Sequence, residues 1–339
     1  MNPLKKTGWF DLQKALSHTG DSFRQLAVLN PLTIRRKGSR AKAVFALSLV
    51  CFFWGTTWLA SKQGVRYMPP LQLAGIRQIL AGLCYVAYFV WRGEKWPPLR
   101  EWRIILLLGF LNFFLNNGLT TWAMAYISAG LGAIIGAIFP LWLVVIGVFG
   151  TSGRIPPRAI LGLLTGFAGV CVIFYEHLQD FWHSGFRFGI MLSLAATWCW
   201  AFGSIYTKRY AGSFNPYFSL GLQMLVSGIC LLGLCSATRM SIPLAAIPWQ
   251  SWLSIGYLVV FGSIIAFIAY LYALQNLTTE QTSLYAYVNP IVAVLLGWLL
   301  FGERLTPVIA LGGAITLAGV YQVNRAYKLP GGGDKEETS

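Results

Sequence analysis

The sequence has very little charge, and what it lacks excludes several classes of protein. Only 11% of its 339 residues are charged and 56% are hydrophobic, whereas charged residues make up about a quarter of a soluble domain. The six cysteines lie inside apolar stretches, with neither zinc-site spacing nor a disulfide framework. Residues 1–43 contain no apolar run long enough for a signal-peptide core. The composition therefore indicates an integral membrane protein without a metal site.

Groups that perform chemistry are also missing from the apolar stretches. The eleven acidic residues and the three histidines lie in loops, in the tails or near the ends of these stretches. An enzyme acting inside the membrane would need a nucleophile with a base, paired acids or a metal cluster there. The sequence therefore predicts that the protein is not an enzyme, and we expect no cofactor.

Ten apolar stretches are long enough to cross a bilayer core, which requires about 20 residues of helix. They are continuous apolar runs, unlike the short alternating segments of a β-barrel, so the predicted fold class is all-α with ten transmembrane helices. The stretches cover residues 44–62, 71–91, 104–124, 128–149, 158–175, 187–207, 216–236, 250–274, 281–301 and 306–324.

The distribution of basic residues orients these helices. If the N-terminus is inside, 20 of the 26 lysine and arginine residues fall in cytoplasmic segments and 5 fall outside. We therefore expect a plasma (inner) membrane protein with cytoplasmic tails at residues 1–43 and 325–339. This bias also accounts for the net charge of +15 without nucleic acid as a partner.

The chain contains an internal duplication. Residues 282–307 match residues 132–157 at a shift of 150. This shift aligns Pro140 with Pro290, Arg154 with Arg304 and Pro157 with Pro307, and a shift of 146 aligns Trp54 and Lys62 with Trp200 and Lys208. Ordered matches of this kind predict two repeats, at 44–175 and 187–324.

Each repeat contains five predicted helices, so the second repeat enters the membrane from the opposite side. Inverted repeats are a recurrent plan of secondary transporters, with the substrate near the bilayer midplane where the repeats meet. The sequence thus predicts two inverted five-helix repeats and a transporter that alternates access around a central cavity.

The chain resembles the ten-helix EamA-type branch of the drug/metabolite transporter superfamily over residues 44–324. The resemblance rests on an ordered set of residues: Trp54-Gly55, Arg77, Pro140, Pro290, Gly302-Glu303-Arg304-Leu305, Gly312 and Gly319. It implies export of small metabolites, often amino acids or related compounds, across an inner membrane. One departure is that Glu303 has Gly153 as its counterpart in the first repeat.

Arg77 is the only formal charge well inside a predicted span, where it costs about 3 kcal/mol unless it faces a cavity or a partner. A substrate carboxylate would be a suitable partner, because guanidinium binds it bidentately. The alternative is a structural arginine bonded to backbone carbonyls or extended to the membrane surface. Gln223 occupies the equivalent position of the second repeat.

The third span has a polar stripe, with Asn112, Asn116 and Thr120 at intervals of four. A stripe of this kind lines a wet cavity or joins two helices through hydrogen bonds. Either role keeps it away from lipid.

The ninth span places Tyr285 and Asn289 on one face, directly before Pro290. Proline leaves the carbonyl of Ala286 without its usual donor, and Pro140 makes the same break in the fourth span. These prolines either take part in gating or only shape the helices for packing.

Several aromatic residues lie in helices expected to meet between the repeats. An aromatic-lined cavity suits an amphipathic or cationic substrate, although packing and lipid contact are the alternative for each ring. The candidates are Trp54, Trp58, Trp200, Tyr270 and Tyr285.

Energy coupling has few candidates. Proton-coupled carriers usually place an acid or histidine inside the membrane, so the sequence favours facilitated transport, or coupling through Glu280 or Glu303 near a helix end. A lipid-linked flippase of the same superfamily and a membrane sensor are the competing functions. The expected partners are a small-molecule substrate and the bilayer, and both a monomer and a homodimer remain open.

Overall fold

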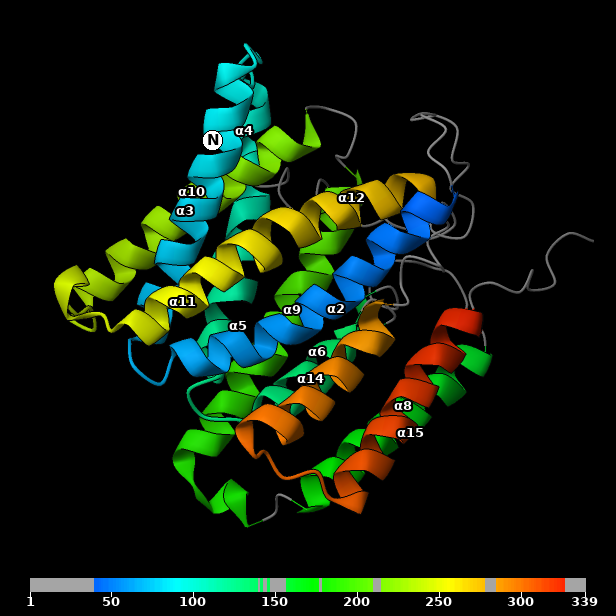
Figure 1. The fold of residues 1–339 in the computed structure, drawn as a ribbon. Helices are drawn as coiled ribbons and strands as arrows, with labels where there is room; N and C mark the ends of the chain where they lie inside the picture. Colours follow the sequence, from blue (N-terminus) through cyan, green and yellow to red (C-terminus); the bar gives the residue numbers. More distant parts are fainter. Residues whose placement is uncertain are drawn as a thin grey trace, which may run out of the picture.

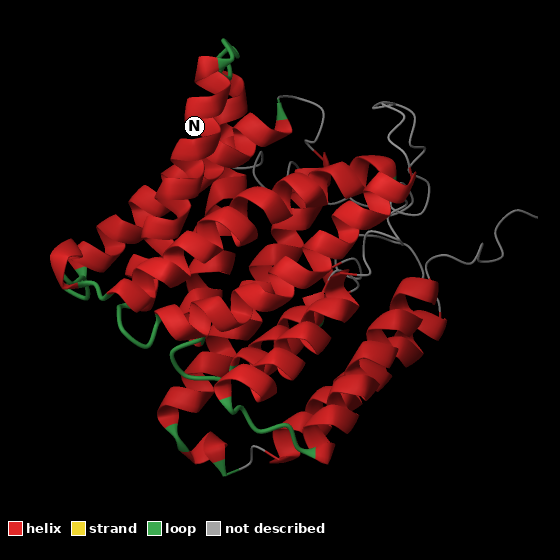
Figure 2. Ribbon diagram, viewed as in Figure 1, coloured by secondary structure: helices red, strands yellow, loops and turns green. Residues whose placement is uncertain are grey.

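The computed structural model describes residues 40–139, 141–142, 145–146, 157–176, 179–209, 215–277 and 285–326. All regular structure within these ranges is helical (Figure 2). In the first half of the chain the elements are α2 (Arg40–Gly64), α3 (Pro70–Trp91), α4 (Leu99–Leu108), η1 (Gly109–Asn117), α5 (Gly118–Ala123), α6 (Ala129–Ala137) and α8 (Pro157–Glu176). In the second half they are η2 (Asp180–Trp182), α9 (Ser184–Arg209), α10 (Pro216–Ala237), η3 (Leu244–Ala246), α11 (Trp249–Tyr257), η4 (Leu258–Ile265), α12 (Ala266–Asn276), α14 (Tyr285–Phe301) and α15 (Pro307–Ala326).

Helix length and hydropathy confirm the predicted helical membrane protein. Six helices in the described ranges are long and apolar enough to span a bilayer: Ala41–Gly64, Pro70–Trp91, Leu99–Ala123, Ser184–Thr207, Pro216–Ala237 and Trp249–Ala273. Three shorter apolar helices cover Ile160–Ile173, Val288–Phe301 and Pro307–Val323. The first of these spans includes residues 41–43, which precede the predicted boundary at residue 44. The count of ten spans stays a prediction.

Prolines mark the start of several helices, because proline has the φ of a helix and its missing N–H is not needed in the first turn. The helices α3 and α10 have proline in their first turn, and α8 and α15 begin at proline: Pro70, Pro216, Pro157 and Pro307. These are matched positions of the two halves, at shifts of 146 and 150.

Two long helices share an unusual feature that the sequence analysis did not predict. The segment Leu99–Ala123 runs from α4 through η1 to α5, and Trp249–Ala273 runs from α11 through η4 into α12. Both η1 and η4 are π-helical. In a π-helix each backbone N–H bonds the carbonyl five residues earlier in the chain, instead of four residues earlier as in an α-helix. Such segments are frequent at functional sites.

The α3 and α10 helices pack closely through glycines. A Cβ added to Gly75 would lie 3.2 Å from the carbonyl oxygen of Gly228, and one added to Gly82 would lie 2.8 Å from that of Gly221. Because the later glycine of α3 meets the earlier glycine of α10, the two helices run antiparallel. Small residues let membrane helices approach in this way.

The α8 and α15 helices form a second pair of the same kind, at the other side of the bundle (Figure 1). A Cβ on Gly162 would lie 2.9 Å from the carbonyl oxygen of Gly319, and one on Gly169 would lie 2.7 Å from that of Gly312. These glycines therefore let the two helices pack closely. A Cβ added to Gly313 would lie 3.7 Å from Ile134, an ordinary contact distance.

Between the two pairs lies α2, which contacts helices from both halves of the chain. It packs against α14, α12 and α11 of the second half and against α6 of the first (Figure 1). Residues on α2 are therefore placed to link the two halves.

Candidate functional site

Five aromatic side chains pack together between α2, α12 and α14, and we call them the aromatic cluster. They are Trp54, Phe139, Phe267, Tyr270 and Tyr285. The centroid of the Trp54 ring lies between 5.0 and 5.2 Å from three of the other rings. Tyr285 is 5.7 Å from Tyr270 and 6.3 Å from Phe139. The structure thus brings three of the predicted site residues into direct contact.

Tyr285 also meets Trp200, which lies on α9. The indole of Trp200 lies close enough to Tyr285 to influence its hydroxyl group. Trp54 and Trp200 are matched positions of the two halves, so each half provides one tryptophan to the same tyrosine. Trp200 thereby joins the aromatic cluster at its edge.

Asn289 connects α14 to α2. With its amide nitrogen as donor, Asn289 donates to the carbonyl oxygen of Tyr285 at 3.0 Å and to that of Cys51 at 2.9 Å. The amide therefore joins the cluster helices through backbone carbonyls, and neither of its two acceptors is the carbonyl of Ala286.

Arg77 lies on α3 and is only 5% exposed. Its Nε donates to Ser263 Oγ at 3.0 Å, the one hydrogen bond that it makes within the described residues. The guanidinium therefore bonds a serine hydroxyl rather than a backbone carbonyl, and it stays inside the bundle instead of extending to the surface. An arginine buried without an anionic partner costs free energy, so it is the strongest candidate for contact with a ligand.

The π-helical turn around Ser263 accepts hydrogen bonds from α2 and α3. Trp54 Nε1 donates to the carbonyl oxygen of Gly262 at 3.2 Å. Tyr85 donates from its hydroxyl to the carbonyl oxygens of Ser263 at 3.1 Å and Ile264 at 3.2 Å. Buried carbonyls require donors, so these side chains hold η4 in its π-helical form.

Gly262 places Arg77 beside the aromatic cluster. Its carbonyl is bonded to Trp54, and a Cβ added to it would lie 3.2 Å from Arg77 Nη2. One residue of η4 thus separates the guanidinium from the indole. The arrangement offers an anion-binding group next to an aromatic surface.

The polar stripe of the third span lies partly in η1. Asn112 is buried, donates from Nδ2 to Thr207 Oγ1 at 3.3 Å, and its Oδ1 packs against Gly203 of α9. Asn116 donates to the carbonyl oxygen of Asn112 at 3.4 Å, and Thr120 is half-buried in α5. Asn112 therefore joins two helices, η1 and α9.

Trp58 has different neighbours from Trp54, although both lie on α2. Its ring packs against α6, where a Cβ on Gly132 or Gly136 would lie 3.1 or 2.8 Å from it. The structure places Trp58 in a helix contact outside the aromatic cluster.

Glu303 caps a helix of the other half of the chain. Its Oε1 accepts from Ala129 N at 2.6 Å and its Oε2 from Gly130 N at 3.0 Å, while Ser128 Oγ accepts from Leu131 N at 3.1 Å. These bonds satisfy the first free N–H groups of α6.

The position of Glu303 follows from the end of α14. Gly302 has a φ of 63°, and Glu303 N donates to the carbonyl oxygen of Gly297 at 3.1 Å. This is the glycine-terminated C-cap that reverses the chain. Lys62 of α2 lies nearby, donates to the carbonyl oxygens of Met124 and Ile127, and interacts electrostatically with Glu303.

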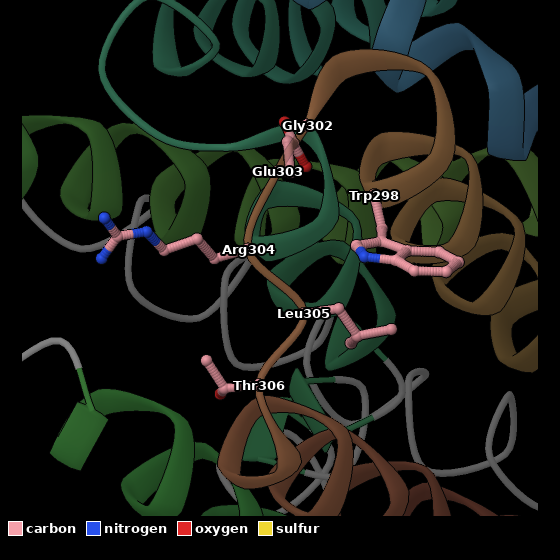
Figure 3. A pocket seen from close by; sticks show the side chains of 6 residues that line it. All are labelled: Trp298, Gly302, Glu303, Arg304, Leu305 and Thr306. Carbon is pink, nitrogen blue, oxygen red and sulfur yellow. The ribbon is translucent and has the colours of Figure 1, made fainter.

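A shallow hollow follows Glu303 in the loop to α15 (Figure 3). In Figure 3, Arg304 and Trp298 point away from each other. Because these groups do not converge, the hollow has no arrangement for holding a ligand.

The two predicted gating prolines are placed differently. Pro290 is buried inside α14, directly after Asn289. Pro140 lies outside the described residues.

Metal ligands are not gathered anywhere in the described part of the chain. It contains no group of three or more histidine, cysteine, aspartate or glutamate side chains that could hold an ion. The candidate site consists instead of one cation, hydroxyls and aromatic rings.

Five residues of this site were missed by sequence reasoning: Tyr85, Gly262, Ser263, and Phe139 and Phe267 of the aromatic cluster. Tyr85 follows Arg77 by eight residues, so both lie on one face of α3. That spacing is the one signal that could have identified Tyr85. In η4, Gly262 is the one glycine and Ser263 the one polar residue of an otherwise apolar segment, and this was the signal available for them.

Comparison with known proteins finds transporters that are similar to this protein over most of the chain. The model of the EamA-like transporter family matches it twice, at residues 41–175 and 187–325. The inner membrane transporter YedA of Escherichia coli is 35% identical over 293 residues, which cover 85% of this chain and 92% of YedA. The transporter YvbV of Bacillus subtilis is 25% identical over 295 residues, covering 85% of this chain and 93% of YvbV.

The similarity extends to a plant protein and to a solved structure. A WAT1-related chloroplastic protein of Arabidopsis thaliana is 26% identical over 282 residues, covering 80% of this chain and 67% of the plant protein. A crystal structure with 19% sequence identity shares the fold, with a TM-score of 0.60 over 85% of this chain and 98% of the other. Because the family model matches both halves and YedA aligns over nearly the whole length, this protein belongs to the EamA-like transporter family of the drug/metabolite transporter superfamily.

Proposed function

We propose that this protein is a secondary transporter that exports small metabolites bearing a carboxylate, in the class of amino acids or related compounds. The observation that supports this is the buried Arg77, which has Ser263 as its one hydrogen-bond acceptor in the described residues. A substrate carboxylate would complete its bonding. The neighbouring aromatic cluster would contact the rest of the substrate.

The proposed mechanism is alternating access between two inverted five-helix repeats, at residues 44–175 and 187–324. The double match of the family model supports the duplication. The antiparallel packing of α3 with α10 and of α8 with α15 supports the inversion, because equivalent helices of an inverted pair run in opposite directions. Each contact also has its symmetric mate, as a two-fold axis requires.

We propose further that both termini are cytoplasmic in an inner membrane. The excess of basic residues in the tails and in alternate loops supports this orientation. The name of the relative YedA, an inner membrane transporter, is consistent with the same compartment.

Glu303, Pro140 and Pro290 are proposed to act in gating. Glu303 of the second half caps α6 of the first half, so separating the halves at that end requires these bonds to break. Pro290 interrupts the backbone ladder of α14 beside the aromatic cluster, which makes this helix a site where bending costs little. Glu303 is also a proposed site for coupling of transport to protons.

The experiment that tests this function is counterflow of amino acids in proteoliposomes, with wild type beside Arg77→Ala and Arg77→Lys. We expect saturable exchange in wild type, its loss in Arg77→Ala, and weak recovery in Arg77→Lys, because lysine keeps the charge without the bidentate geometry. Exchange of no amino acid would overturn the substrate class, and a flippase would then be tested with lipid-linked substrates. Equal exchange in all three proteins would overturn the site.

A further inference from the structure

The π-helical segment η4 determines which edge of Arg77 is free. A guanidinium has five N–H donors, and Ser263 Oγ takes the one on Nε. The Nη1 and Nη2 edge has no acceptor among the described residues. A carboxylate approaching Arg77 is thereby directed to this edge.

Gly262 packs closely beside the same edge. A Cβ at this position would lie 3.2 Å from Arg77 Nη2 and 2.7 Å from Thr57 Cγ2. Any larger residue would therefore press on both α2 and the guanidinium. The absence of a side chain lets the guanidinium keep its place beside Ser263.

The backbone of η4 is fixed from two sides. Trp54 of α2 bonds the carbonyl of Gly262, and Tyr85 of α3 bonds the carbonyls of Ser263 and Ile264. Since Arg77 and Tyr85 lie on the same helix, the distance between guanidinium and serine hydroxyl is set by packing and does not depend on a ligand. The site is preorganised, which lowers the cost of binding.

We propose that Ser263 and Gly262 are positioning residues for a carboxylate bound end-on to Nη1 and Nη2 of Arg77. This inference rests on the proposed function, because it assumes that Arg77 meets the substrate. Comparison of the two halves of the sequence does not identify either Ser263 or Gly262. The proposed binding mode also restricts the substrate group to a planar anion with two oxygens, since a carboxamide lacks the charge and one acceptor.

The test is protection of Arg77 from phenylglyoxal, an arginine reagent, measured by mass spectrometry on the purified full chain. Phenylalanine is the carboxylate probe and phenylalaninamide the matched probe without the anion. We expect phenylalanine to protect Arg77 in wild type and phenylalaninamide to give no protection. The exposed Arg304 is an internal control, and its rate of modification should not change with either probe.

The variants are Ser263→Ala, Ser263→Thr, Gly262→Ala and Gly256→Ala. Ser263→Ala should raise the half-protecting phenylalanine concentration by about 10-fold, the effect of losing a hydrogen bond to a charged group, and Ser263→Thr should restore it. Gly262→Ala should abolish protection. Gly256→Ala should behave as wild type, because a Cβ there meets nothing within 4 Å.

The outcomes separate the inference from the function on which it rests. Protection that is equal in wild type and Ser263→Ala would overturn the inference and leave Arg77 as the substrate contact. Absence of protection in wild type would overturn both. Equal protection by phenylalanine and phenylalaninamide would overturn the preference for a carboxylate.

Discussion

The two π-helical segments η1 and η4 occupy matched positions in the two halves but bond different groups. The carbonyls of η4 accept from Trp54 and Tyr85 of the first half, and Ser263 accepts from Arg77. In η1, Gly109 accepts from Ser227 and Asn112 accepts from Asn116 of the same segment. The same backbone irregularity therefore serves a charged site in one half and helix packing in the other.

The residues at the position of Arg77 account for this difference. Its counterpart Gln223 donates to Ser219 of its own helix at 3.0 Å, and so has a local partner. Arg77 has no anionic partner within the described residues. One half therefore carries a cation at this position and the other does not, and we expect the substrate to bind nearer to Arg77 than to Gln223.

The largest expected effect comes from breaking this asymmetry. Arg77→Ala should lower substrate affinity by about 10- to 100-fold, the range for lost hydrogen bonds to a charged group. Gln223→Ala, its matched control, should change affinity by less than about 3-fold. Concentration-dependent counterflow measures both. Similar losses in the two variants would mean that the halves contribute equally.

The next largest effect, on stability, is expected where α3 and α10 pack against each other through matched glycines. Gly82→Ala and Gly228→Ala should each destabilise the protein by about 1–3 kcal/mol, the usual cost of overpacking. The added methyl would lie 2.6 Å from Leu225 N in one case and 2.8 Å from Ile79 N in the other. Thermal unfolding in detergent measures this. Gly233→Ala, where a Cβ meets nothing within 4 Å, should be neutral.

A smaller effect is expected at the cap between the halves. Glu303→Gln should destabilise the protein by about 1 kcal/mol, because an amide is a weaker acceptor for the α6 N-terminus than a carboxylate. If Glu303 couples transport to protons, this variant should also lose the pH dependence of counterflow. A variant with the wild-type pH profile would exclude Glu303 from coupling.

The smallest effect is expected at the polar stripe. Asn116→Ala should change affinity by less than about 3-fold, because its amide makes one long bond of 3.4 Å to the backbone of η1. Counterflow with the same substrate as for Arg77→Ala gives the comparison. A loss as large as that of Arg77→Ala would place η1 in the substrate site as well.

Much of the helical framework could be predicted from the sequence, because proline, glycine and apolar runs act locally. Pro70 and Pro216 begin helices where the apolar runs begin, and Arg77 was identifiable as the one charge inside a span. The π-helices could not be predicted, since one extra residue in a turn leaves the apolar run unchanged.

Contacts between residues that are far apart in the chain also could not be predicted from the sequence. Trp54 and Trp58 share a face of α2, yet of these two only Trp58 packs against the glycines of α6. Glu303 was identified as an acid near a helix end, but its partner N–H groups lie 173 and 174 positions away in the chain. Such contacts depend on how the two halves meet.

The pairing of α8 with α15 has a consequence for biosynthesis. Domains and segments leave the ribosome in order from the N-terminus, and α15 is the last described helix to emerge. Until then the glycine face of α8, at Gly162 and Gly169, faces lipid or the insertion machinery. A nascent chain stopped before Pro307 would leave that face without its partner helix, so we expect such truncated chains to be less stable than the full-length protein.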